Sequence, residues 1–230
     1  MSSGPTTSTP RRRRSDGERS RAAILREAAR LATVEGLDGL SLARLAQAVG
    51  MSKSGLFAHF GSKEELQLAT IDAARTIFDE LVIEPANAAA PGVPRLLDYV
   101  ERFLDHVEEG VFPGGCFFVS AVSELNTHPG PVRDGAMAFS GRWLGLLATE
   151  VAAAQAVGEL DPTAEPAQIA FELNAFMVAG NLQFVASGDR TVLQSVRTAV
   201  DSRLQNAQNT GTTTIATAAN SSASGSPSRQ

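Results

Sequence analysis

The chain has 230 residues, of which 43% are hydrophobic, enough to bury a core in one large domain or two smaller ones. Its single cysteine, Cys116, excludes an internal disulfide, and no histidine or cysteine cluster has metal-ligand spacing, so we expect neither a metal nor a cofactor. We find no run of about 18 apolar residues and no signal-peptide centre, which predicts a cytoplasmic protein without membrane contact.

The net charge of −5 conceals an asymmetry along the chain. Residues 1–63 hold 11 Lys and Arg against 5 Asp and Glu, a net charge of +6, and residues 64–230 hold 9 against 20, a net charge of −11. Phosphate contacts need cations at the contact surface, so the basic front predicts a polyanion partner. Solvated charge without a partner is the alternative interpretation.

The chain begins with a segment rich in Ser, Thr, Pro and Arg, predicted to be a disordered arm over residues 1–15. Its run Arg11–Arg14 could enter a DNA minor groove or serve only to solubilise the chain. Four helices follow, each bounded by caps or breakers. They are predicted over residues 18–35, 42–49 after Ser41, 53–59 after Ser52, and from the capping box of Ser62 and Glu65 to residue 84.

Pro85, Pro91 and Pro94 mark a boundary, and no sustained alternation typical of strands appears beyond it. Five further helices are predicted over residues 93–109, 115–127, 131–157, 163–187 and 190–204. The fold class is therefore all-α, with an N-terminal DNA-binding domain and a larger helical ligand-binding and dimerisation domain. The predicted segments are the arm 1–15, the domains 16–84 and 85–205, and a disordered tail 206–230.

The segment Ser41–Phe60 has the layout of a helix-turn-helix: a short capped helix, a turn at Gly50 and a second capped helix. Six apolar residues give the two helices inward faces: Leu42, Leu45, Ala46, Val49, Leu56 and Phe60. Four others fall where a DNA groove could be met: Lys53, Ser54, Phe57 and His59. Gly55 keeps the helix surface flat, so that the backbone can approach DNA closely, at a cost of about 1 kcal/mol in helix stability.

This segment resembles the tetracycline-repressor (TetR) family of transcriptional regulators, through Val49-Gly-Met-Ser-Lys-Ser-Gly-Leu-Phe57 and His59-Phe-Gly-Ser-Lys-Glu-Glu-Leu66. The resemblance covers residues 19–74 well. Beyond them it is limited to the helical layout and to the stretches Phe112–Phe117 and Pro129–Asp134. It implies a homodimeric repressor that binds a double-stranded DNA operator and is released by a small-molecule effector.

Carried over by position, the resemblance implies that Ser41 and Lys63 bind backbone phosphates at helix N-termini. It also implies that Lys53 and Ser54 reach base edges beside the cap Ser52, with Arg44 at the groove rim and His59 on phosphate. Phe57 stands where the family usually has tyrosine, so a hydroxyl contact to phosphate is absent. The family often has arginine at the position of Ala43, which leaves Arg44 either to take over that role or to face solvent.

The second domain is expected to hold the effector pocket and the dimer interface. Core packing explains most of its aromatic residues, and the candidates for a pocket lining are Phe103, Phe112, Phe117, Phe118, Phe139, Trp143 and Phe176. The helix predicted over residues 163–187 is apolar on two faces, so one face should meet a second subunit. The residues proposed for that face are Phe171, Val178, Leu182 and Val185.

The sequence leaves two rival functions open. In an enzyme, Cys116 at a helix start would be the nucleophile, although His106 and His128 have no recognisable relation to it as bases. A sequence-indifferent architectural DNA binder is favoured by the arginine arm and opposed by the acidic second domain. The sequence predicts a regulator and not an enzyme.

Overall fold

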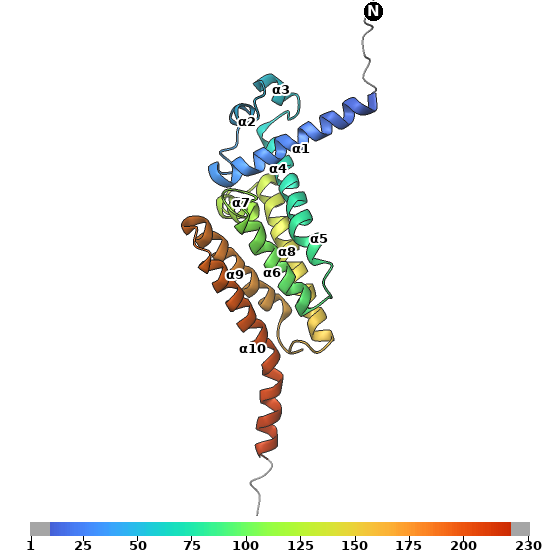
Figure 1. Ribbon diagram of the computed structural model, residues 1–230, viewed down its shortest axis with the longest axis vertical. Coiled ribbons are helices and arrows are strands. Elements are labelled where there is room, and N and C mark those ends of the chain that lie inside the picture. Colours follow the sequence, from blue (N-terminus) through green and yellow to red (C-terminus); the bar gives the residue numbers. More distant parts are fainter. Residues whose placement is uncertain (1–9, 222–230) are drawn as a thin grey trace, which may run out of the picture. The chain divides into compact units, whose positions relative to one another are not determined.

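The computed structural model describes the backbone of residues 10–221 and the side chains of residues 17–208. Over these residues it contains helices and no strand, which confirms the all-α prediction (Figure 1). The elements are α1 (Pro10–Glu35), α2 (Leu42–Ala48), α3 (Lys53–Phe57), α4 (Lys63–Phe78), a π-helix (Asp79–Ile83), α5 (Glu84–Ala86), α6 (Val93–Glu108), α7 (Phe117–Leu125), α8 (Pro131–Ala156), α9 (Pro166–Ser187) and α10 (Thr191–Ser221).

Contacts between residues divide the chain into two compact units. The first unit runs to Asp79 and includes Gly110–Phe139, and the second contains Glu80–Glu109 and the chain from Ser140 onward. Helix α7 therefore belongs to the same unit as α1–α4, although about thirty residues of the other unit separate them in sequence. The division predicted from the sequence, into residues 1–15, 16–84, 85–205 and 206–230, stays a prediction.

The first unit is built around α1, which packs against α2, α4 and α7. Small residues of α1, such as Ala28 and Ala29, are fully buried and allow its neighbours to approach closely. A cluster of phenylalanine rings completes this core: the rings of Phe118 and Phe139 are stacked, and Phe78 meets both edge-on. This core supports the short helices α2 and α3.

The second unit is a helical layer in which α6, α9 and α10 pack on one another. Helices α9 and α10 approach each other closely at Gly180, where an added Cβ would lie 2.3 Å from Cγ2 of Val196. Two ion pairs fasten α10 to its neighbours, Arg197 to Glu101 of α6 and Arg203 to Glu172 of α9. Glycine at position 180 is therefore required by the packing of this helix pair.

Three helices differ from the sequence prediction. The helix predicted to run to residue 84 changes at Asp79 from α to π geometry. Pro85 explains this, because it cannot donate a helical hydrogen bond and its ring would clash with the carbonyl of Leu81 in a regular α-helix.

Helix α1 begins at Pro10 rather than near residue 18, and α10 continues to Ser221 rather than ending near residue 204. Of the segments predicted to be disordered, 1–15 and 206–230, residues 10–15 and 206–221 are therefore helical. Residues 1–9 and 222–230 lie outside the described residues, as do the side chains of Arg11–Arg14.

Helix α9 is long and apolar enough to cross a membrane by length and composition, with a mean hydropathy of 1.3 over its most apolar window. The sequence analysis found no such segment. About 33% of that window is buried in the protein, and the helix carries Glu172, Asn174 and Asn181, which would be costly in hydrocarbon. Asn174 accepts a hydrogen bond from the indole of Trp143, and Asn181 is buried. These features fit a packing helix of a helical domain.

Candidate nucleic-acid interface

Helices α2 and α3 are joined by a tight turn, and two hydrogen bonds close it at the end of α2. At the end of α2 the backbone N–H of Met51 donates to the carbonyl of Ala46 at 2.9 Å, and that of Gly50 donates to Gln47 at 3.4 Å. Gly50 has a φ of +66°, which favours glycine, and the two bonds form a Schellman motif. The turn predicted at Gly50 is therefore present.

Serine side chains cap the helices as the sequence predicts. Ser41 Oγ accepts from the N–H of Arg44 at 3.2 Å, and Ser52 Oγ accepts from Gly55 at 3.0 Å. At α4, Ser62 Oγ accepts from the N–H of Glu65, whose carboxylate accepts in turn from the N–H of Gly61. The last bond reaches one residue further than in a standard capping box. These caps fix the starts of three short or exposed helices.

Burial separates an inner from an outer face of the two helices. Leu45, Leu56 and Phe60 are completely buried, Leu42 and Ala46 are nearly so, and Val49 is half-buried. On the outer face, Lys53, Ser54 and Phe57 are exposed and line an open depression of the surface. The ring of Phe57 is 49% exposed. Helix α3 thus offers a cation, a hydroxyl and an aromatic ring to solvent on one side.

Gly55 has a second role that the sequence analysis did not foresee. A Cβ at this position would lie 3.1 Å from Ser52 Oγ and 3.6 Å from Cε of Met51. An alanine would therefore crowd the hydroxyl that caps α3. This internal contact gives a reason for glycine that does not involve DNA, and the close approach of DNA to Gly55 stays a prediction.

Arg21 of α1 holds the residues that directly follow α3. The sequence alone does not predict this contact. Its guanidinium donates to the carbonyl of His59 at 2.7 Å and lies 4.3 Å from the centre of the Phe60 ring. His59 itself is half-buried. No local pattern signals this contact, because 38 residues separate donor and acceptor.

Two cations of the predicted site, Arg44 at the groove rim and Lys63 at a phosphate, are held in ion pairs. Arg44 donates to Glu35 through Nη2 at 2.6 Å and Nε at 2.9 Å, so it does not simply face solvent. Lys63 Nζ donates to Asp38 at 2.9 Å, and this hydrogen bond and the charge of Lys63 lower the pKa of the Asp38 carboxyl. Both pairs are largely exposed and each contributes at most about 1 kcal/mol, so a phosphate can replace the carboxylate.

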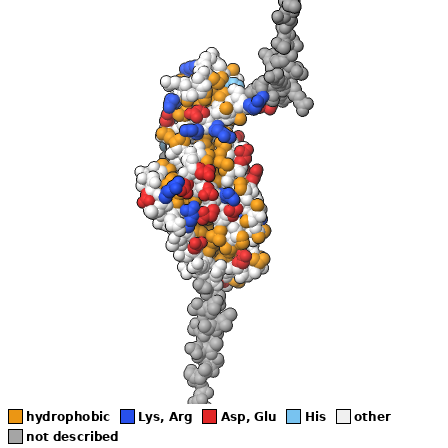
Figure 2. Space-filling model, in the orientation of Figure 1, with side chains coloured by type: hydrophobic (Ala, Val, Ile, Leu, Met, Phe, Trp, Pro, Cys, Tyr) orange, Lys and Arg blue, Asp and Glu red, His pale blue; other side chains and the backbone are white. Residues whose placement is uncertain are grey.

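Basic and acidic side chains are interspersed on the face drawn in Figure 2, with apolar side chains between them. A broad basic field is not visible on that face.

Comparisons with known proteins match this arrangement to one family. The model of the bacterial regulatory proteins of the tetR family matches residues 24–70, and the model of the tetracyclin repressor-like C-terminal domain matches residues 92–200. The chain belongs to the TetR family of transcriptional regulators. The helix-turn-helix predicted at Ser41–Phe60 lies within the first match and is confirmed.

Solved structures of TetR regulators share the fold. A regulator from Chloroflexus aurantiacus is 24% identical with a TM-score of 0.77, over 83% of this chain and 96% of that one. AibR, solved with isovaleryl coenzyme A and operator DNA, is 26% identical with a TM-score of 0.62, over 78% and 96%. Reduced NemR from E. coli is 22% identical with a TM-score of 0.62, over 79% and 95%. No curated protein is similar enough to this chain to be counted as a relative.

The seven aromatic residues predicted to line an effector pocket of this TetR regulator fall in three places. Four of them, Phe112, Phe117, Phe118 and Phe139, are buried in the ring cluster of the first unit. Phe103 and Trp143 are buried in the second unit, where Trp143 meets Tyr99 edge-on. Their membership in a pocket stays a prediction.

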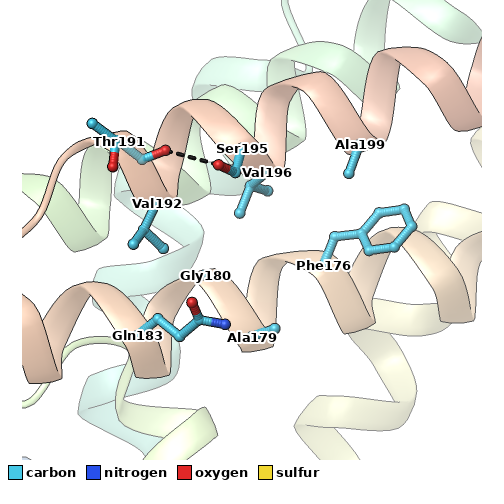
Figure 3. Close-up of a pocket in the computed structure, with 9 residues that line it drawn as sticks. All are labelled: Phe176, Ala179, Gly180, Gln183, Thr191, Val192, Ser195, Val196 and Ala199. Atoms are coloured by element: carbon cyan, nitrogen blue, oxygen red, sulfur yellow. Dashed lines mark hydrogen bonds between the residues drawn. The ribbon is translucent and has the colours of Figure 1, made fainter.

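Phe176 lies in an open groove of about 230 Å³ between α9 and α10. Figure 3 shows its ring pointing into the space between the two helices, towards the side of α10 that carries Val196 and Ala199. The groove is mainly apolar, with Gln183 at one end. Sequence reasoning could not find the residues that α10 contributes, because they are small and carry no motif.

The residues predicted for a dimer interface share one side of α9. Phe171, Leu182 and Val185 are 59%, 53% and 42% exposed, and Val178 is half-buried. The opposite stripe, which includes Ile169 and Leu173, is buried in the second unit. Three large apolar side chains exposed on one side of α9 indicate a contact surface that the described residues leave uncovered.

Proposed function

We propose that this TetR-family regulator is a homodimeric repressor that binds a palindromic operator and is released from it by a small molecule. The observation that carries the proposal is the outer face of α3. Lys53, Ser54 and Phe57 are exposed there on a helix whose start is capped and whose end is fastened to α1. A rigid, exposed helix of this kind can enter the major groove of DNA.

In this proposal Lys53 and Ser54 contact base edges, and Phe57 makes an apolar contact beside them. Ser41, Ser52, His59 and Lys63 contact the phosphate backbone, with Arg44 at the groove rim and Gly55 allowing close approach. Lys63 and Arg44 exchange their carboxylate partners for phosphates. Each of the two cations therefore has an anionic partner both before and after DNA binds.

The exposed apolar side of α9 supports dimerisation, and we place the dimer in the cytoplasm. A second copy that covers Phe171, Leu182 and Val185 removes apolar surface from water, at roughly 25 cal/mol for each Å². An isologous dimer presents two α3 helices related by a twofold axis. This symmetry explains why the operator should be a palindrome.

Two observations support the class of the effector: the chemistry of the second unit and one similar solved structure. AibR, which shares 26% of its residues with this chain, was solved with both isovaleryl coenzyme A and operator DNA. That precedent supports a ligand-responsive repressor here. The aromatic and aliphatic side chains of the second unit favour an apolar or partly apolar small molecule.

A Cys116-dependent enzyme is the weaker alternative. Cys116 precedes α7, but it is only 2% exposed, and burial raises the pKa of its thiol to about 11. Desolvation therefore outweighs any stabilisation of a thiolate by the helix dipole. Near neutral pH the sulfur is a protonated thiol with little nucleophilic character.

The proposal is tested by selecting bound DNA from a random pool with the full-length protein at two salt concentrations. An enriched palindrome that is bound less tightly as salt rises is the expected result. Recovery of unrelated sequences at both salt concentrations would instead support the sequence-indifferent architectural binder.

A further inference from the structure

A carboxylate from α7 holds the turn that joins α1 to α2. Glu124 is half-buried, and its two oxygens accept from consecutive backbone N–H groups, Leu37 at 2.7 Å and Asp38 at 2.8 Å. The turn is shaped to admit this carboxylate: Gly36 has a φ of +84°, and a Cβ there would lie 2.7 Å from Glu124 Oε1. Two charge-assisted hydrogen bonds to one carboxylate form a specific and stiff contact.

The same two residues of the turn are held from α4. Gln67 Nε2 donates to the carbonyl of Leu37 at 2.8 Å in a buried hydrogen bond, and Lys63 Nζ donates to the carboxylate of Asp38 at 2.9 Å. A continuous set of bonds therefore leads from Glu124, through Leu37 and Asp38, to the lysine at the start of α4. Helix α2 begins at Leu42, four residues after Asp38.

A second contact joins the segment before α7 to α1. The N–H of Gly114 donates to Thr33 Oγ1 at 3.2 Å, and a Cβ at Gly114 would lie only 2.0 Å from the carbonyl oxygen of Thr33. Backbone therefore lies against backbone at this point. The segment Gly110–Leu125 is thus fastened to α1 in one place and to the α1–α2 turn in another.

We propose that Glu124 is a positioning residue for DNA binding. It sets the α1–α2 turn, and through the turn it sets the start of α2, the helix that carries Arg44. A displacement of Glu124 therefore acts on Leu37 and Asp38 directly and on α2 through them. The inference rests on the proposed function, because it assumes that α2 and α3 contact DNA.

Glu124→Gln tests this role with little change of volume. The amide retains one acceptor oxygen, but its NH₂ group then opposes a backbone N–H of the turn, so the paired contact is lost. The matched control is Glu109→Gln, which removes the same charge at an exposed position. For each full-length variant, affinity for the selected duplex, its dependence on salt and the denaturant midpoint are measured.

The expected result is an affinity about tenfold weaker for Glu124→Gln at a temperature where all variants are folded, with the control within about twofold of wild type. The salt slope should also fall by about one, because Arg44 on the displaced helix α2 no longer reaches its phosphate. A lower denaturant midpoint with unchanged affinity and slope would show that Glu124 is only a structural staple and would overturn the inference.

Failure of the proposed function and failure of the variant to fold give different results. If wild type enriches no sequence, the proposed function fails before the variant is measured. If wild type binds and Glu124→Gln does not fold, Glu124→Asp replaces it, since the carboxylate is kept but shortened by one methylene. That variant must also lose more affinity than the control, and an unchanged affinity would contradict the proposal.

Discussion

Gly114→Ala is expected to destabilise the protein strongly, because this glycine lies against the backbone of α1. The new Cβ would be 2.0 Å from the carbonyl oxygen of Thr33 and 2.7 Å from its carbon, so one backbone must move by more than an ångström. Overpacking of this kind typically costs 1–3 kcal/mol, and loss of the Gly114 to Thr33 hydrogen bond adds about 1 kcal/mol. The free energy of unfolding should therefore fall by about 2–4 kcal/mol.

The measurement is urea unfolding followed by far-UV circular dichroism at fixed protein concentration. Gly141→Ala is the matched control, since Gly141 is exposed in the interior of α8 and a Cβ there meets nothing within 4 Å. It should raise the free energy of unfolding by about 0.5–1 kcal/mol, because alanine favours a helix. If Gly114→Ala loses less than about 1 kcal/mol with an unchanged m-value, the close approach of the Gly110–Leu125 segment to α1 is refuted.

Three further predictions concern other parts of the protein. Burial lowers the pKa of His106 to about 4 in the folded state, so the unfolded state binds its proton more tightly, and the free energy of unfolding falls as pH drops from about 6.5 towards 4. Between pH 7 and pH 5, wild type should lose about 2 kcal/mol more than His106→Asn in urea titrations, and equal losses would show that His106 does not titrate in this way. Burial raises the pKa of the Cys116 thiol, so iodoacetamide at pH 7 should alkylate it at least about a hundred times more slowly in the folded than in the unfolded protein. Similar rates in the two states would contradict its burial. Leu182→Arg, on the exposed side of α9, should convert a dimer to a monomer in sedimentation velocity, whereas an unchanged sedimentation coefficient would exclude this side of α9 as the interface.

Local chemistry made the helix-turn-helix predictable. Ser41, Ser52 and Ser62 cap their helices as expected, and Gly50 adopts the positive φ that the turn requires. Each of these interactions joins residues at most a few positions apart, so the order of residues in the sequence already contains it. The match to the TetR family confirms the segment that they define.

Contacts between distant segments could not be predicted in the same way. Glu124 and Leu37 are 87 residues apart, and nothing near Glu124 distinguishes it from a solvated glutamate. The pairing of Lys63 with Asp38 and of Arg44 with Glu35 likewise depends on how α1, α2 and α4 pack. The π-helix before Pro85 is different, because a proline in the sequence indicates a helix end but does not show that the helix changes from α to π geometry before it.

The central claim is that α3 reads DNA sequence, and it is tested most directly by fluorescence anisotropy on the selected palindrome and on a scrambled duplex. The account predicts that Lys53→Ala lowers the ratio of the two affinities by about 10- to 100-fold, because a base contact contributes about 1–3 kcal/mol of discrimination. Lys63→Ala, the control, should weaken binding to both duplexes alike, since a phosphate contact carries no sequence information. If Lys53→Ala leaves the ratio of affinities unchanged, α3 does not read bases through this lysine and the account is contradicted.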